Sequence, residues 1–175
     1  MSARNELHAV MMLVEDKPGV MSRVAETFRR RSINIDTITV GKSEREGLSR
    51  IIVTLRQNAE TVDLVVRLLK KMIDVVEIKE LDLSTSILRE LVLIKVKAKD
   101  RDERSEVLQL VNIFRGQVVD VAEDSMVVQI TGAPSKTNAF IELLKRFEIL
   151  EITRTGIVAL ERGASFYADE DNNSD

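Results

Sequence analysis

The sequence contains no cysteine and only one histidine. The lack of cysteine excludes disulfides, thiolate metal sites and cysteine nucleophiles, and it fits a protein of the cytoplasm, where disulfides are rare. The histidine, His8, lies in an apolar run that is typical of a strand, so we expect a structural role for it. We therefore predict neither a catalytic site nor a metal site in this chain.

Aromatic residues make up 3% of the chain, and its seven glycines are scattered rather than grouped in a phosphate-binding loop. Few aromatic side chains leave little capacity for stacking on nucleic-acid bases. The formal net charge is −3, with acids and bases mixed along the chain, so we expect no basic surface for nucleic acid. No apolar run reaches the roughly 20 residues of a membrane helix, and the first residues lack the build of a signal peptide. We predict a soluble, cytoplasmic protein with no nucleic-acid or membrane partner.

The chain does contain enough apolar residues for a core, at 44% hydrophobic and 31% charged, as in ordinary globular domains. In its first half, patterns of period 2 and period 3.6 alternate in the order β-α-β-β-α-β. The predicted strands cover residues 7–14, 33–40, 48–56 and 74–81; one predicted helix follows Gly19 and the other covers residues 59–72.

The second half repeats this order. It contains a predicted strand at 90–98, a helix marked by Val107, Leu110, Val111 and Phe114, a hairpin at 116–132, a helix at 135–147 and an extended end at 148–160. This plan builds an antiparallel sheet with two helices on one face. The predicted fold class is therefore α+β, with two ferredoxin-like βαββαβ domains in tandem. We place the domains at 7–81 and 90–163, a linker at 82–89, and an acidic tail, expected to be disordered, at 164–175.

The stretch EDKPG separates the first predicted strand from the first helix and is a candidate ligand site. Pro18 fixes φ for entry into the helix, and Gly19 leaves room for close approach of a ligand. Free amides of Gly19, Val20 and Met21 would attract a carboxylate, while Asp16 can accept from an ammonium group. A free amino acid satisfies both requirements, with an apolar side chain resting on Val20 and Met21. The alternative is structural: Asp16 is the N-cap of the helix and accepts from the Gly19 amide.

Asn34 is a polar residue in the otherwise apolar predicted strand 33–40, where a buried amide needs a hydrogen-bond partner. That partner is either a backbone group or a ligand, and the residues alone leave both open. In the second half, VVDV (118–121) stands in the corresponding place. KAKDRDERSE (97–106), without proline or glycine, replaces the turn. The candidate site therefore belongs to the first half alone.

Seven stretches between residues 7 and 163 carry a resemblance that is more specific than the turn. They are EDKPGVMSRVAETFRRRSINIDTITVG (15–41), LSRIIVTL (48–55), IDVVEIKEL (73–81), RELVLIKVKA (89–98), IFRGQVVDV (113–121), ITGAPSKTNAFIELLKRF (130–147) and ILEITRTGIVALERG (149–163). In this order they closely resemble the small, regulatory subunits of acetolactate synthase (acetohydroxyacid synthase). The D-x-P-G turn by itself is only the general mark of an ACT domain, a module that senses small molecules.

The resemblance implies an N-terminal ACT domain for effector binding and dimerisation, followed by a second ferredoxin-like domain. It implies a homodimer with ACT sheets side by side, and an effector, usually valine, between the turn of one protomer and the Asn34 strand of the other. Carried over by position, the effector-binding residues are Asp16, Pro18, Gly19, Val20, Met21, Asn34 and Ile35. Members of the family often carry asparagine at the position of Asp16 and leucine at that of Met21, so effector identity and affinity are less fixed here.

The implied partner is the catalytic subunit, a transferase that makes acetolactate from pyruvate and carries thiamine diphosphate, magnesium and FAD. This chain would carry no cofactor. It would activate the catalytic subunit allosterically and confer feedback inhibition in valine, leucine and isoleucine biosynthesis. The alternative is a stand-alone ACT-domain amino-acid sensor with another client protein. The negative charge disfavours a DNA-binding regulator, and the lack of catalytic residues disfavours an independent enzyme.

Overall fold

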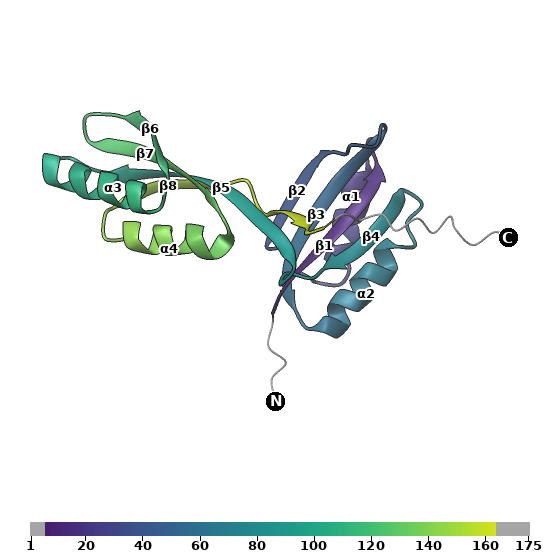
Figure 1. The fold of residues 1–175 in the computed structure, drawn as a ribbon. Helices are drawn as coiled ribbons and strands as arrows, with labels where there is room; N and C mark the ends of the chain where they lie inside the picture. The colour runs from purple at the N-terminus through teal and green to yellow at the C-terminus, as the bar shows by residue number, and fades with distance from the viewer. Residues whose placement is uncertain (1–5, 164–175) are drawn as a thin grey trace.

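The computed structural model describes residues 6–163, which form two βαββαβ units one after the other (Figure 1). The first unit consists of β1 (Glu6–Glu15), α1 (Val20–Arg29), β2 (Thr37–Lys42), β3 (Leu48–Gln57), α2 (Ala59–Leu69) and β4 (Val75–Leu81). Its strands form an antiparallel sheet in the order β2-β3-β1-β4. The fold class predicted from the sequence is confirmed.

The core of the first unit lies between the sheet and its two helices. From β1, the side chains of Val10, Met12 and Val14 face this core. The helices contribute Val20, Val24 and Phe28 of α1 and Val62, Val65 and Leu69 of α2. The other face of β1 is buried as well, with Ala9, Met11 and Leu13 at 0%, 1% and 2% exposure. A strand that is covered on both faces has a continuous apolar sequence, which explains the run LHAVMMLV.

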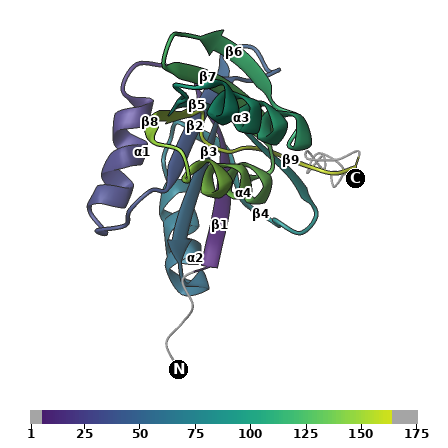
Figure 2. The same ribbon diagram turned by 90° about the vertical axis from the view of Figure 1, so that its left-hand side faces the viewer.

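The second unit consists of β5 (Ser86–Lys97), α3 (Arg101–Ile113), β6 (Gln117–Val121), β7 (Ser125–Gly132), α4 (Pro134–Leu144) and β8 (Ile149–Arg154). Its antiparallel sheet has the order β6-β7-β5-β8. Helices α3 and α4 lie side by side on one face of this sheet (Figures 1 and 2). The rings of Phe114 and Phe140 meet in the core beneath them, with centroids 5.2 Å apart.

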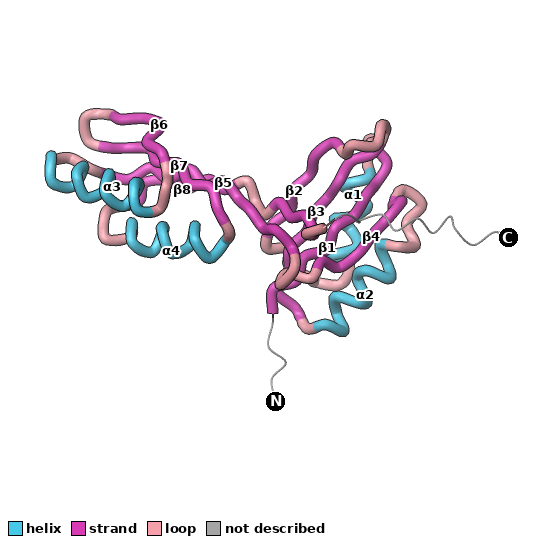
Figure 3. Tube along the Cα trace, in the orientation of Figure 1, coloured by secondary structure: helices cyan, strands magenta, loops and turns pink. Residues whose placement is uncertain are grey.

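The two units share the long strand β5, which runs from one into the other (Figures 1 and 3). The second half of β5 belongs to the C-terminal sheet, whereas Ser86–Arg89 pair with β9 (Val158–Glu161). The segment predicted as one extended end at 148–160 is therefore two strands, and only β8 stays in the C-terminal sheet. A glycine makes the change of direction possible, because Gly156 has a φ of +85° and a Cβ there would lie 2.9 Å from Thr39 Oγ1.

Strand β9 covers the outer face of the N-terminal sheet. Ala159 packs there in a cluster with Ala9, Met11, Ile52 and Leu81. This apolar face needs a covering layer, and the chain supplies it from its own C-terminal segment. The division into domains at 7–81 and 90–163 stays a proposal. Strand β9 belongs to the second of these ranges but packs on the first unit. The predicted tail, 164–175, lies outside the described residues.

The structure corrects several predicted boundaries. Strand β2 begins at Thr37, and Asn34 is exposed in the loop before it, so the prediction of a strand from residue 33 with a buried asparagine is wrong. The cause is the end of α1, where Ser32 has a φ of 54° and the Ile33 amide donates to the Phe28 carbonyl at 3.1 Å. Ile33 thereby enters the core and Asn34 faces solvent.

The helices predicted at 59–72 and 135–147 both end earlier, at Leu69 and Leu144. None of the helices within residues 6–163 is long and apolar enough to span a bilayer.

Candidate functional site

The turn between β1 and α1 has the geometry of a type II β-turn. The carbonyl of Lys17, at its first position, accepts from the Val20 amide at 3.4 Å. Pro18 supplies the fixed φ of the second position, and Gly19, at the third, has φ 89° and ψ −13°. Because a side chain is disfavoured at this positive φ, the Pro-Gly pair determines the turn.

Two main-chain hydrogen bonds fix this turn against neighbouring segments. The Glu15 amide donates to the Asp74 carbonyl at 2.9 Å, in the connection from α2 to β4. The Asp16 amide donates to the Gly47 carbonyl at 2.9 Å, in the hairpin between β2 and β3. The turn therefore lies at the end of the sheet where β2 finishes, with Asp16 and Pro18 exposed.

The first turn of α1 has main-chain donors to offer. The N-cap is Gly19, and no side chain among the described residues caps the helix, so the structural alternative, in which Asp16 is the N-cap and accepts from the Gly19 amide, is wrong. Within residues 6–163, no acceptor bonds to the amides of Gly19 and Met21. Unpaired amides at a positive helix end bind carboxylates. The site can therefore accept an anionic group next to the Asp16 carboxylate.

The structure brings five of the predicted site residues together at this turn: Asp16, Pro18, Gly19, Val20 and Met21. The role of Val20 differs from the prediction in two respects. Its amide was predicted to be free, but it donates to the Lys17 carbonyl at 3.4 Å. The side chain of Val20 is 2% exposed and belongs to the core, so it cannot form the floor of a ligand site. Met21 is partly buried against the same core and remains available at its edge.

The other two predicted residues, Asn34 and Ile35, lie at the opposite end of α1. The helix between them and the turn has 10 residues, a length of about 15 Å. The neighbouring Asp36 confirms this placement, because its amide donates to Thr54 and its carboxylate pairs with Arg56 at 3.0 Å, far along β3 from the hairpin. Within one chain the two parts of the predicted site do not meet.

Strand β2 is an edge strand with apolar side chains that the sequence analysis did not single out. Ile38 and Val40 lie opposite Val53 and Ile51 of β3, whose side chains face the helices. The side chains of Ile38 and Val40 are nevertheless 37% and 47% exposed. On the other face of β2, the Thr39 hydroxyl donates to the Ile157 carbonyl at 3.1 Å. The alternation TITV in the sequence predicted this strand, but it did not indicate that the apolar side chains of the strand would be exposed.

Charged residues follow the turn along α1. The pKa of the Glu26 carboxyl is lowered to about 2, because Arg29 and then Arg30 donate hydrogen bonds to it. Glu26 therefore stays ionised throughout the physiological range. An open hollow of about 500 Å³ lies beside it, lined by Ser22, Arg23, Glu26, Thr27, Arg30 and Met72.

The corresponding turn of the second unit is closed by its own side chains. Asp100 caps α3 by accepting from the Glu103 amide at 2.8 Å, and the Glu103 carboxylate accepts from the Lys99 amide at 2.8 Å. This reciprocal capping satisfies the amides of Lys99 and Glu103 through side chains, a device that the start of α1 lacks among residues 6–163. The difference agrees with the sequence comparison, in which only the first half carries the Pro-Gly turn.

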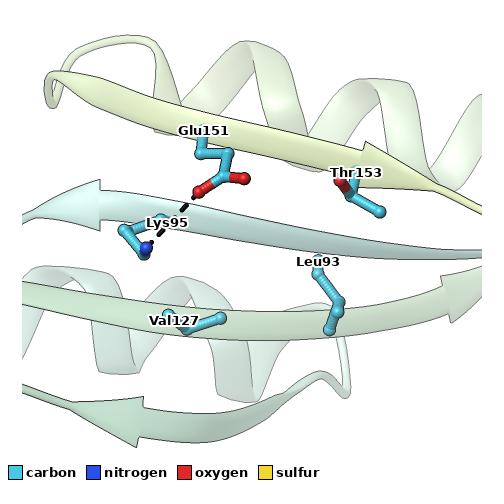
Figure 4. A pocket seen from close by; sticks show the side chains of 5 residues that line it. All are labelled: Leu93, Lys95, Val127, Glu151 and Thr153. Atoms are coloured by element: carbon cyan, nitrogen blue, oxygen red, sulfur yellow. Dashed lines mark hydrogen bonds and ion pairs between the residues drawn. The ribbon is translucent and has the colours of Figure 1, made fainter.

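A second hollow, of about 230 Å³, lies on the face of the C-terminal sheet opposite its helices (Figure 4). It is lined by Leu93, Lys95, Val127, Glu151 and Thr153, and Lys95 pairs with Glu151 at 3.3 Å. It contains none of the predicted site residues. Among residues 6–163, acidic and histidine side chains do not group in a way that could hold a metal ion.

Comparison with known proteins matches both units to one family. A family model described as "Small subunit of acetolactate synthase" matches residues 89–163, and one described as "AHAS small subunit-like ACT domain" matches residues 10–77. The "Probable acetolactate synthase small subunit" of Methanothermobacter thermautotrophicus is 43% identical over 91% of this chain and 95% of its own length. The small subunit of Mycolicibacterium smegmatis is 38% identical over 93% and 95%. The crystal structure of the Thermotoga maritima small subunit superposes with a TM-score of 0.82, at 42% identity over 91% and 99% of the two chains.

Proposed function

Because the chain belongs to the family of acetolactate synthase small subunits, we propose that it is the regulatory subunit of that enzyme in the cytoplasm. In this role it activates a catalytic subunit, a transferase, and confers feedback inhibition by valine in branched-chain amino acid biosynthesis. Thiamine diphosphate, magnesium and FAD belong to the catalytic partner. The observation that carries the proposal is the uncapped start of α1, with free amides beside Asp16.

Both charged groups of a free amino acid fit this turn. The carboxylate accepts from the amides of Gly19 and Met21, and Asp16 accepts from the ammonium group. A carboxylate side chain at position 16 favours the ammonium more strongly than asparagine would, but it cannot donate to the ligand carboxylate. The effector therefore depends more on the main chain for its carboxylate.

A homodimer that pairs β2 with β2 would complete the site. In an antiparallel pair about a two-fold axis, the start of β2 in one protomer lies beside its end in the other. The turn lies near the end of β2, through the bond from Asp16 to Gly47, and Asn34 lies just before its start. Pairing would therefore bring the Asn34–Ile35 loop of one protomer to the turn of its partner and cover Ile38 and Val40.

Inhibition would follow from linkage between the effector and the catalytic subunit. Valine shifts the complex only if it binds one state better than another, and the catalytic subunit must then alter valine affinity by the same factor.

Valine should stabilise the isolated chain against heat. At a hundredfold excess over Kd the expected gain is about 2.7 kcal/mol per site, or roughly 5–10 °C in Tm for a chain of this size. Differential scanning fluorimetry with valine, leucine, isoleucine and, as control, alanine measures the shift. No shift with any branched-chain amino acid would sink the assignment of the turn as their site.

Mixing the chain with the catalytic subunit should raise acetolactate production, and valine should reverse this gain. The isolated chain should form no acetolactate from pyruvate with thiamine diphosphate, FAD and Mg²⁺ added. A pull-down with and without valine shows whether the subunits associate. Valine binding without association would favour a stand-alone amino-acid sensor, and turnover by the chain alone would contradict a regulatory role.

A further inference from the structure

The turn is also held by an ion pair between segments that are 51 residues apart in the sequence. Arg23, the fourth residue of α1, donates from Nε to Asp74 Oδ2 at 2.7 Å and pairs through Nη2 with Oδ1 at 2.7 Å. The carboxylate is buried, with 8% of the Asp74 side chain exposed. Two parallel contacts from a planar guanidinium fix orientation as well as distance.

The main chains of the two paired residues bond to both ends of the turn. The Asp74 carbonyl accepts from the Glu15 amide at the end of β1, and the Arg23 amide donates to the Gly19 carbonyl at 3.1 Å. The Arg23 Nη1 atom also lies 3.4 Å from the place where a Cβ on Gly19 would stand. The strand end, the helix start and the α2–β4 connection are thus tied at one point.

The second unit fixes its first turn in another way. Arg104, likewise the fourth residue of α3, donates to the carbonyls of Ala98, Ala122 and Glu123. It ties its turn to the β6–β7 hairpin through main-chain acceptors alone. Only the first unit, whose helix start is open, binds this arginine to a buried carboxylate outside the hairpin.

We propose that Arg23 and Asp74 are positioning residues for the effector site and hold the free amides of α1 at the angle a carboxylate requires. This inference rests on the proposed effector function. Lysine cannot replace Arg23, because its ammonium has no bidentate geometry. Removing either partner frees the α2–β4 connection to move and lets the turn rotate.

Calorimetric titration of the full chain with valine tests the proposal. Arg23→Lys and Asp74→Asn should each raise Kd at least about tenfold. The double variant should lose no more than either single one, because both remove the same interaction. Arg29→Lys is the matched control. Arg29 lies on the same helix, its side chain is 75% exposed, and among residues 6–163 its ion pair is with Glu26 alone, so the Kd of this variant should stay within about twofold of wild type.

Amide hydrogen exchange separates the outcomes. Arg23→Lys and Asp74→Asn should accelerate exchange at the Glu15 amide about tenfold, whereas Arg29→Lys should not. A purely structural pair would lower Tm and leave Kd unchanged in variants still folded at the assay temperature, which would overturn the inference. If wild type binds no branched-chain amino acid, the proposed function fails. In that case, faster exchange in the variants still supports fixing of the turn by the pair, and unchanged exchange refutes it.

Discussion

Gly19→Asp should abolish inhibition by valine while the chain still activates the catalytic subunit. The new carboxylate would stand beside the free amides of α1, where the effector carboxylate is expected. Two like charges about 4 Å apart cost about 4 kcal/mol at the effective dielectric of a protein surface, which corresponds to roughly a thousandfold loss of affinity. The second unit has an aspartate at the corresponding position, because Asp100 is the N-cap of α3 and its side chain accepts from the Glu103 amide. Valine titration of reconstituted enzyme activity measures the effect.

Gly19→Ala is the control for this substitution. Like aspartate, alanine at position 19 has to adopt the positive φ of the native turn, 89°, at a cost of about 1–2 kcal/mol, but it adds no charge. We expect it to weaken inhibition much less than Gly19→Asp does. Equal loss in both variants would show that backbone strain, and not charge, disturbs the site. Loss of activation together with inhibition would mean that the turn is only structural.

If the chain forms the proposed homodimer, Val40→Lys should dissociate it and remove valine binding with it. Val40 is 47% exposed on the edge strand β2, and a two-fold interface would contain the lysine twice. Paired like charges at a strand edge oppose association, so we expect the dimer Kd to rise at least about a hundredfold. Sedimentation velocity measures the association, and calorimetry measures valine binding to the same samples.

The control is Val121→Lys on β6, one of the two edge strands of the C-terminal sheet, where the Val121 side chain is 55% exposed. It adds the same charge to a similar edge and should leave both the dimer and valine binding intact. Monomeric Val40→Lys that still binds valine with native affinity would refute a site shared between protomers. Dissociation by Val121→Lys alone would place the interface on the C-terminal unit.

The sequence by itself determined the order of the elements as far as β8 and the place of the turn. Period 2 and period 3.6 are local properties of strands and helices, so β3 and α2 could be read from their apolar positions. The Pro18–Gly19 pair likewise fixes a turn through its own backbone preferences. The motifs quoted above also pointed to the family that the comparisons then matched.

Only the tertiary structure decided which distant segments meet. Asn34 was predicted to be buried, and Ile33 occupies the core position instead. The last strand, β9, packs on the N-terminal sheet and not in the C-terminal sheet, and Arg23 forms an ion pair with Asp74. Such pairings depend on the free energy gained when an apolar sheet face is buried, or when a buried charge is paired with one of opposite sign. That free energy arises from contacts between segments that are distant in the sequence, so it cannot be read from a local pattern of residues.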